Sequence, residues 1–347
     1  MDLVEAFRLQ AAACEDLGSP MYADLLRRMV DEYEIGGSVS DVLVGYEDQP
    51  AGAAIALRLL GSVHRMVLAG EAPELAAFYP SVGGEWDQRL GWEAFDQVLT
   101  ARGPELRSLL TQPPQTNEVG RSTALYGGLL RLAEVVPLPV RLFEIGASGG
   151  LNLRADQFRY NLADGSSYGI ADSPVVFENA WSGRPIPPVP DLRIVERVGS
   201  DIAPVNPLSE DGALTLTSYV WPDMAARLER LRGALEVARK VPADVRREDA
   251  LSFLRNLELA EEHVTVVWHS VMWQYLTPED QAAADDLITA LGARATPSAP
   301  LAHLCLEPMR RTPEAEPEFL VVLQVWPGGV PRILGSSDPH GLPAHWE

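Results

Sequence analysis

The sequence predicts an α/β protein in which an all-helical segment precedes a mostly parallel sheet. Up to residue 136, apolar residues recur at helical spacing, and no strand-like alternation of useful length interrupts them. From Pro137 onward, short apolar runs alternate with helical stretches, which is typical of a parallel sheet covered on both faces. The last two apolar runs are joined only by residues 327–331, and so short a link requires antiparallel pairing.

The first 136 residues are expected to form a helical domain. Leu3, Phe7 and Cys14 fall on one helical stripe, and Ser19-Pro20 supplies an N-cap and a favoured first-turn proline for a second helix. Further helices are predicted over residues 53–69, 91–110 and 122–135.

Residues 137–347 are expected to form the α/β domain. The strand candidates are Val140–Ile145, Leu214–Val220, Val264–His269, Leu301–Leu306, Phe319–Trp326 and Arg332–Leu334. Helical stretches at 224–238, 250–259 and 278–291 lie between them. Prolines break the rhythm between about residues 161 and 212, which indicates a loop-rich insertion with strand-like runs at 175–177 and 193–198.

Composition excludes some classes of partner. The 347 residues include 28 Lys plus Arg and 49 Asp plus Glu, a formal net charge of −21. Nucleic-acid binding depends on basic side chains that release counterions from phosphates, so this charge argues against DNA or RNA. It argues equally against an anionic membrane surface. A small molecule or a peptide is the expected partner.

The two cysteines and the amino terminus favour a cytoplasmic protein. Cys14 and Cys305 lie far apart in apolar contexts, which predicts two buried thiols, no disulfide framework and no structural metal site. No basic region followed by an apolar run begins the chain. The apolar stretch 55–69 is broken by charged residues, so no membrane-spanning helix is expected.

A small-residue turn follows the first predicted strand and precedes a predicted helix. It reads Glu144-Ile-Gly146-Ala147-Ser148-Gly149-Gly150-Leu151. Small residues let a ligand approach the backbone, and the amino end of a helix offers N–H groups to a carboxylate or phosphate. A tight turn without a ligand is the other interpretation.

Two functional interpretations of this turn fit poorly. A dinucleotide site requires glycine where this chain has Ser148 and Leu151. A hydrolase nucleophile elbow, G-x-S-x-G, is satisfied at Ser148, with His340 as the base. However, an α/β-hydrolase builds several strands before its elbow, and only helices are predicted here before Val140.

A third interpretation rests on a resemblance. Glu144-x-Gly146-x-Ser148-x-Gly150 resembles the first motif of class I S-adenosylmethionine-dependent methyltransferases. Residues 244–254, 264–276 and 301–308 look like later segments of that family, and the terminal antiparallel pair matches its sixth and seventh strands. The resemblance covers about residues 138–347 and implies a Rossmann-like, methyltransferase-type sheet that binds S-adenosylmethionine.

The chain as a whole also resembles an uncharacterised bacterial family of unknown function. The motifs that carry this resemblance are Gln115-Thr-Asn-Glu-Val-Gly-Arg121, Glu144–Leu153, Trp221-Pro-Asp223 and His340-Gly341. This resemblance implies no activity, so the fold is a firmer inference than methyl transfer.

The methyltransferase resemblance implies roles for several residues. The turn over Gly146, Ala147, Ser148, Gly149 and Gly150 would pass under the methionine part of the cofactor, with Glu144 helping to position it. The acid that binds the ribose is expected to be Asp223, with Asp201 as the alternative, and Asp249 is expected beside the adenine. Asp223 and Asp249 could equally be helix N-caps.

Other side chains are candidates for the acceptor side of the site. His269 follows an apolar strand and could act as a base, or it could be a structural histidine. Asn117, Glu118, Arg121 and Tyr275 are candidate substrate contacts, although the first three could form a capping cluster. His269-Ser-Val-Met stands where enzymes that methylate amide or base amino groups carry Asn/Asp-Pro-Pro-Tyr, which disfavours those substrates.

The predicted function is methyl transfer from S-adenosylmethionine to a small-molecule or peptidic acceptor by in-line displacement. Alignment of the two reactants would supply most of the catalysis. A non-catalytic binding or regulatory protein is the alternative, and a serine hydrolase that uses Ser148 is the third interpretation.

Overall fold

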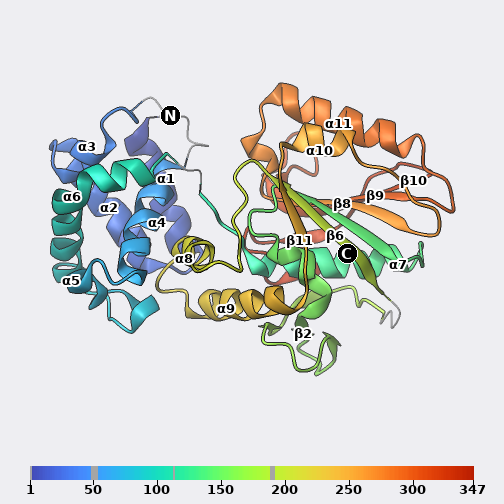
Figure 1. The fold of residues 1–347 in the computed structure, drawn as a ribbon, viewed down its shortest axis with the longest axis horizontal. Coiled ribbons are helices and arrows are strands. Elements are labelled where there is room, and N and C mark those ends of the chain that lie inside the picture. Colours follow the sequence, from blue (N-terminus) through green and yellow to red (C-terminus); the bar gives the residue numbers. More distant parts are fainter. Residues whose placement is uncertain (1, 48–53, 112–113, 188–191) are drawn as a thin grey trace. The chain divides into compact units, whose positions relative to one another are not determined.

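The computed structural model describes residues 2–47, 54–111, 114–187 and 192–347 and divides the chain into two compact units (Figure 1). The helical unit comprises residues 1–116 and 209–229, and the sheet unit comprises residues 117–208 and 230–347. This division differs from the single boundary predicted at residue 136, because residues 117–136 belong to the sheet unit and residues 209–229 to the helical unit.

Among its described residues, the helical unit contains an α-helix in each range predicted up to residue 110, together with three shorter α-helices that the sequence does not predict. Its helices are α1 (Leu3–Asp16), α2 (Pro20–Glu34), α3 (Ser38–Leu43), α4 (Ile55–Leu68), α5 (Pro73–Ala76), α6 (Leu90–Leu109) and α8 (Glu210–Ser218). Asp2 accepts a hydrogen bond from Glu5 N at the start of α1, and Ser19 accepts one from Tyr22 N at the start of α2. The buried apolar faces of α1 to α6, including Phe7 and Phe95, form one core.

The strand predicted over Leu214–Val220 is wrong, because most of this run lies in helix α8. Ser209 caps the helix by accepting from Gly212 N, and Glu210 and Asp211 lie in its first turn, where acidic groups favour a helix. A short apolar run cannot be assigned to a strand or a helix from its periodicity alone, so the capping residues were the better signal.

The sheet unit contains a nine-stranded sheet in the order β5-β12-β11-β10-β9-β8-β1-β6-β7. Five parallel strands form one side: β1 (Val140–Ile145), β6 (Ile194–Asp201), β7 (Asp244–Arg247), β8 (Val264–Ser270) and β9 (Leu301–Met309). Antiparallel pairing adds β10 (Glu318–Trp326), β11 (Arg332–Ser337) and β12 (Ala344–Trp346), and β5 (Trp181–Gly183) pairs parallel with β12. The mostly parallel sheet and the terminal antiparallel pair β10–β11 are confirmed.

The predicted insertion is more ordered than its prolines indicate. Its first part forms a three-stranded sheet of β2 (Arg159–Asn161), β3 (Ser167–Gly169) and β4 (Val176–Phe177). Its later part supplies β6, which pairs directly with β1. The second strand of the parallel set therefore comes from the segment that sequence patterning describes as loop-rich.

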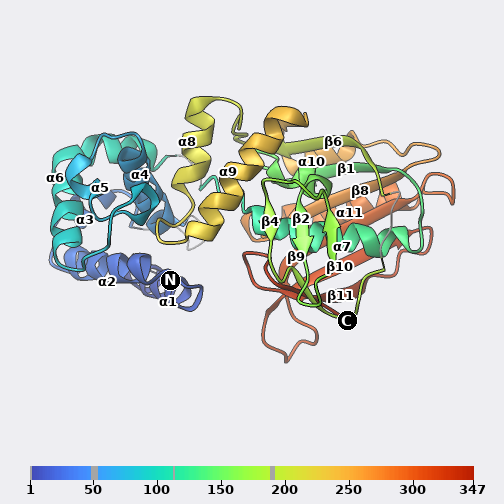
Figure 2. The ribbon, with the colours of Figure 1, turned by 90° about the horizontal axis from the view of Figure 1, so that it is seen from below.

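Helices cover both faces of the large sheet. Helix α10 (Ala250–Arg255) and α11 (Pro278–Gly292) lie over one face, and α7 (Ser122–Ala133) lies against the other (Figure 1). From below, α7 and the small sheet lie on the near side of the strands (Figure 2). Gly128 of α7 approaches Leu304 of β9, whereas Ile288 of α11 belongs to a core that includes Phe143 and Val267.

Helix α9 (Ala225–Lys240) begins in the helical unit and ends in the sheet unit. Among the helices of the described segments, none has the length and apolar character needed to cross a membrane.

Candidate functional site

The carboxyl ends of the parallel strands meet at one edge of the sheet. Along the sheet from β7 to β9, these strands are the third, second, first, fourth and fifth of the set in chain order. The order reverses between β1 and β8, and in open parallel sheets ligands bind outside the carboxyl ends at such a reversal. The side chains that follow β1, β6 and β8 are therefore the candidate site.

The turn after β1 has a backbone that favours small residues. Gly146, Ser148 and Gly150 all have positive φ, of 69°, 52° and 66°. Ser148 is held in this conformation because its N–H donates to Oδ2 of Asp201 over 2.9 Å, while Oδ1 of Asp201 accepts from Ala203 N. Residues 147–150 are buried and Gly146 is exposed, so the backbone of Gly146 is the accessible point of the turn.

Glu144 is the buried acid beneath this turn. Its side chain is 3% exposed, and its Oε2 atom has no hydrogen-bond partner among the residues described. Burial raises the pKa of Glu144 to about 8, although Trp268, Arg154 and Arg121 oppose part of the rise. At pH 7 the carboxyl group is therefore mostly protonated, and it can donate a hydrogen bond as well as accept one.

The segment before α7 packs beside the turn. Asn117 Oδ1 accepts from Leu151 N over 2.9 Å, and Glu118 Oε1 accepts from Gly120 N over 2.9 Å. The Asn117 and Glu118 side chains are buried. These contacts match the capping interpretation, because both side chains satisfy backbone N–H groups at the edge of the sheet.

Arg121 joins two sequence motifs that are far apart in the chain. Its Nε donates to the carbonyl oxygen of Pro339 over 3.0 Å, and its Nη1 donates to that of Ser270 over 3.4 Å. A Cβ on Gly120 would lie 2.2 Å from the His340 carbonyl oxygen, so only glycine allows this approach. Two of the motifs that carry the resemblance to the bacterial family thus meet at the end of β8.

The three candidate acids lie in different places. Asp201 is the last residue of β6, the strand beside β1. Asp223 lies in the helical unit, where it accepts from Ser19 Oγ over 2.6 Å and from Met21 N over 3.0 Å. Asp249 follows β7 but caps α10, and hydrogen bonds from the N–H and hydroxyl of Ser252 lower its pKa. Asp201, the alternative in the sequence analysis, is the acid at the turn.

His269 is enclosed on all sides. It is 1% exposed, and the Trp273 ring stacks on it with centroids 4.5 Å apart. Its Nδ1 lies 2.8 Å from Glu307 Oε1, and its Nε2 lies 2.8 Å from His303 Nε2. Both ring nitrogens are engaged, so the structure does not present His269 to an acceptor. Tyr275 is more than half exposed in the short helix after β8.

Sequence reasoning missed His303 and Glu307. Burial and the neighbouring His269 lower the pKa of His303 to about 3, which keeps its imidazole neutral at pH 7. The available signal was the spacing of His303, Cys305 and Glu307 at every second residue of a strand, which places them on one face. Both cysteines are buried free thiols, as predicted, and burial raises the pKa of Cys305 above its usual range.

Comparison with known proteins identifies the family. Residues 4–346 match the family model described as an uncharacterized protein conserved in bacteria (DUF2332). A search of the curated proteins finds no match to this chain. Because the family model spans nearly the whole chain, the protein belongs to this bacterial family.

Proposed function

We propose that the sheet unit binds S-adenosylmethionine at the turn after β1 and directs methyl transfer to a small-molecule or peptidic acceptor. The observation that carries the proposal is the position of Asp201, which ends the strand beside β1 and binds the Ser148 N–H. The order of the five parallel strands, which reverses between β1 and β8, also supports the proposal, because ligands bind at such a reversal in open parallel sheets.

The residues at this edge fit the proposed cofactor. Gly146 exposes backbone without a side chain, which allows close approach of a ligand. The carboxylate of Asp201 has further acceptor capacity for ribose hydroxyls, and the adjoining Ile202, 66% exposed, offers an apolar surface to a base. The unpartnered Oε2 of Glu144 lies beneath the turn and is available to a polar group or a bound water.

S-adenosylmethionine supplies an electrophilic methyl group when it is bound. The work of the chain is then to hold the two reactants in line, which by itself removes a large part of the barrier. His269 is not assigned as the base, because both of its ring nitrogens already have partners. The hydrolase interpretation lacks its expected topology, since no strand precedes β1 among the residues that the structure describes.

Calorimetric titration of S-adenosylmethionine and S-adenosylhomocysteine into the full chain tests the proposal. Gly146→Asp is expected to abolish binding, because its side chain would occupy the space proposed for the cofactor, and its Cβ would lie about 3.0 Å from Met272. Gly165→Asp is the matched control: Gly165 also has a positive φ, of 85°, but nothing lies within 4 Å of its Cβ position. It carries the same charge and a similar backbone strain, so it should bind normally.

Asp201→Asn gives a second, graded test. Replacing a charged acceptor by a neutral one should weaken binding about 10- to 100-fold, since hydrogen bonds to charged groups contribute about 1.5–3 kcal/mol. Absence of binding at millimolar ligand, or equal binding by Gly146→Asp and Gly165→Asp, would contradict the proposal. Binding without turnover across an acceptor panel would instead support a regulatory protein.

A further inference from the structure

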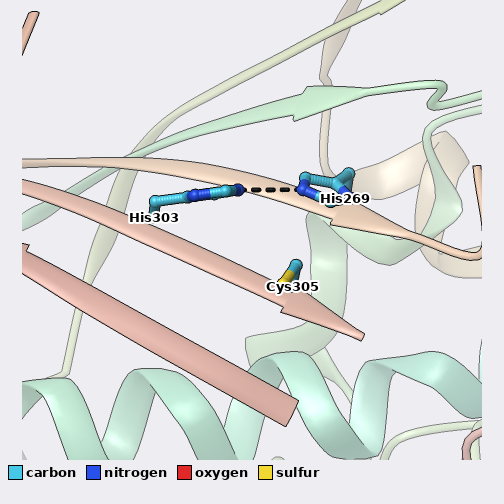
Figure 3. A group of neighbouring side chains, drawn as sticks. All are labelled: His269, His303 and Cys305. Atoms are coloured by element: carbon cyan, nitrogen blue, oxygen red, sulfur yellow. Dashed lines mark hydrogen bonds between the residues drawn. The ribbon is translucent and has the colours of Figure 1, made fainter. Parts of the chain in front are cut away.

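The central strands carry a second cluster of chemistry-bearing side chains on the opposite face of the sheet from Glu144. His269 of β8 pairs in register with Cys305 of β9, and Val267 pairs with His303. Because side chains alternate along a strand, His269, His303 and Cys305 share one face. Figure 3 shows the two imidazoles pointing toward each other from neighbouring strands, with the Cys305 thiol beside them. We call these three residues the His–Cys cluster.

The hydrogen bonds around His269 determine which of its ring nitrogens carries the proton and which carries the lone pair. Glu307 Oε1 accepts from Met272 N over 3.1 Å and from Trp273 N over 3.3 Å, and it lies 2.8 Å from His269 Nδ1. A carboxylate oxygen in this position accepts, so Nδ1 carries the proton. In the neutral imidazole, Nε2 of His269 then carries the lone pair and accepts the hydrogen bond from Nε2 of His303 over 2.8 Å. A metal ion between the two rings would replace this hydrogen, and His303 would hold its proton on Nδ1 instead.

This arrangement is the one that metal-binding histidines use. A histidine that ligates a metal through one nitrogen almost always donates its other N–H to a carboxylate or a carbonyl group, which fixes the ring orientation. Glu307 provides that support to His269, and the two backbone N–H groups in turn fix the carboxylate.

We propose that His269, His303 and Cys305 form a zinc-binding site, with Glu307 as the positioning residue. Imidazole nitrogen and thiolate sulfur are both ligand types that Zn²⁺ binds, whereas Ca²⁺ and Mg²⁺ require oxygen ligands. Copper also binds sets of two histidines and one cysteine, so the test below includes it. The three ligand atoms already lie within 4.8 Å of one another. Three protein ligands leave the fourth tetrahedral position to water or to another molecule.

The distances require only small rearrangements. In a tetrahedral zinc site with Zn–N of about 2.0–2.1 Å and Zn–S of about 2.3 Å, the ligand atoms lie about 3.3–3.6 Å apart. The two Nε2 atoms, now 2.8 Å apart, must separate by about 0.5 Å, and the thiol must approach by about 1 Å. Side-chain rotation covers such distances without moving the strands.

Charge balance supports a divalent ion at this buried position. Zn²⁺ binding would displace the proton of the Cys305 thiol to solvent. The resulting thiolate and the carboxylate of Glu307 together offset the two positive charges, so the occupied site is neutral overall. Asp285 of α11 acts electrostatically on both His269 and Cys305 and adds a further negative group on this face. Without an ion, two imidazoles face each other beside a thiol, and Glu307 Oε2 has no partner among the described residues.

Metal titration of the full chain tests this proposal independently of cofactor binding. After treatment with a chelator and dialysis, Zn²⁺ is titrated by calorimetry and Co²⁺ by absorption spectroscopy. One Zn²⁺ per chain is expected to bind, and Co²⁺ is expected to give visible d–d bands together with a thiolate-to-cobalt charge-transfer band. S-adenosylmethionine is absent throughout, so the result does not depend on the function proposed above.

Matched variants assign the ligands. Cys305→Ser should lose the charge-transfer band, and Cys14→Ser, which removes the other buried thiol, should keep it. His303→Gln provides a second ligand variant at a partly exposed position, where folding is less at risk, and it should lose tight Zn²⁺ binding. Glu307→Gln should keep the band and weaken Zn²⁺ binding about 10- to 100-fold. Circular dichroism confirms the fold of each variant.

Three results would overturn the proposal: no Zn²⁺ binding by the chelator-treated chain, a Co²⁺ complex without the thiolate band, or unchanged binding by both Cys305→Ser and His303→Gln. Binding of copper without any binding of zinc would overturn the metal assigned.

Discussion

Replacing Glu144 by glutamine is expected to remove a specific pH dependence of the stability of the sheet unit. Burial raises the pKa of Glu144 from an ordinary value of 4.5 to about 8. Between these two values the folded state holds a proton that the unfolded state has released. Stability therefore falls as pH rises through this window, because the unfolded state binds fewer protons than the folded state.

The size of the effect follows from the same two values. Each pKa unit corresponds to about 1.4 kcal/mol, so the shift from 4.5 to about 8 lowers the free energy of unfolding by at most about 5 kcal/mol between pH 4.5 and pH 8. Glutamine at position 144 keeps the shape of the protonated acid and does not ionise. The variant should match the natural chain near pH 4.5 and become progressively more stable than it toward pH 8.

Unfolding of both chains in denaturant is measured at a series of pH values, with hydrogen exchange of peptides from β1 as the readout. This readout gives the difference in free energy of unfolding between the variant and the natural chain for the sheet unit alone. Subtracting the two curves cancels the other titrating groups, since both chains contain them. Glu258→Gln, at an exposed position of the same unit, is the control and should run parallel to the natural chain. Parallel curves for Glu144→Gln as well would refute the reasoning and show that Glu144 is ionised in the folded state at neutral pH.

Further substitutions test other contacts. Asp223→Ala removes the acceptor of two hydrogen bonds, so it should lower the stability of the helical unit by about 2–3 kcal/mol in denaturant unfolding. It should leave S-adenosylmethionine binding unchanged, and weakened binding would show that Asp223 belongs to the ligand site after all. Gly120→Ala should cost about 1–3 kcal/mol, because its Cβ would meet the His340 carbonyl oxygen at 2.2 Å, and a thermal melt unchanged from the natural chain would contradict this close approach. Ser209→Ala should cost about 1 kcal/mol by removing the N-cap of α8, and Ser209→Asp should restore it in the same melt.

The parts of the fold that the sequence predicts are those with strong local signals. Val140–Ile145 is a strand with the predicted bounds, because its buried apolar run ends at a glycine turn. The N-cap that Ser19 provides for α2 is equally local. Leu214–Val220 fails because a short apolar run fits either a strand or a helix, and here most of the run lies in α8, which is capped by Ser209 and packs against α4. The strand-like run predicted at 193–198 lies in β6, but the prolines around it indicate a loop-rich insertion, and its place beside β1 in the large sheet depends on a long-range pairing.

The candidate site shows the same division between local and long-range information. The turn at Gly146–Gly150 is contiguous, so the sequence locates it. The acid beside this turn lies far from it in the sequence. Asp201 is brought there only by the pairing of β6 with β1, and Asp223 looks equally suitable in the sequence. The spacing within β9 places His303, Cys305 and Glu307 on one face, but only the register of β8 against β9 brings His269 beside them.

Glu144 on one face of the sheet and the His–Cys cluster on the other both lie near β8. Trp268 and His269 are successive residues and therefore face opposite sides of the sheet, toward Glu144 on one side and toward Glu307 on the other. Burying such groups costs free energy that an apolar core would not, and at Glu144 this cost reaches about 5 kcal/mol at pH 8. The amino-terminal halves of β1 and β8 contain apolar residues such as Leu142, Val264 and Val266 instead. Titratable groups with perturbed pKa values concentrate at functional sites, so the position of Glu144 near the end of β1 is consistent with the ligand site proposed at that edge.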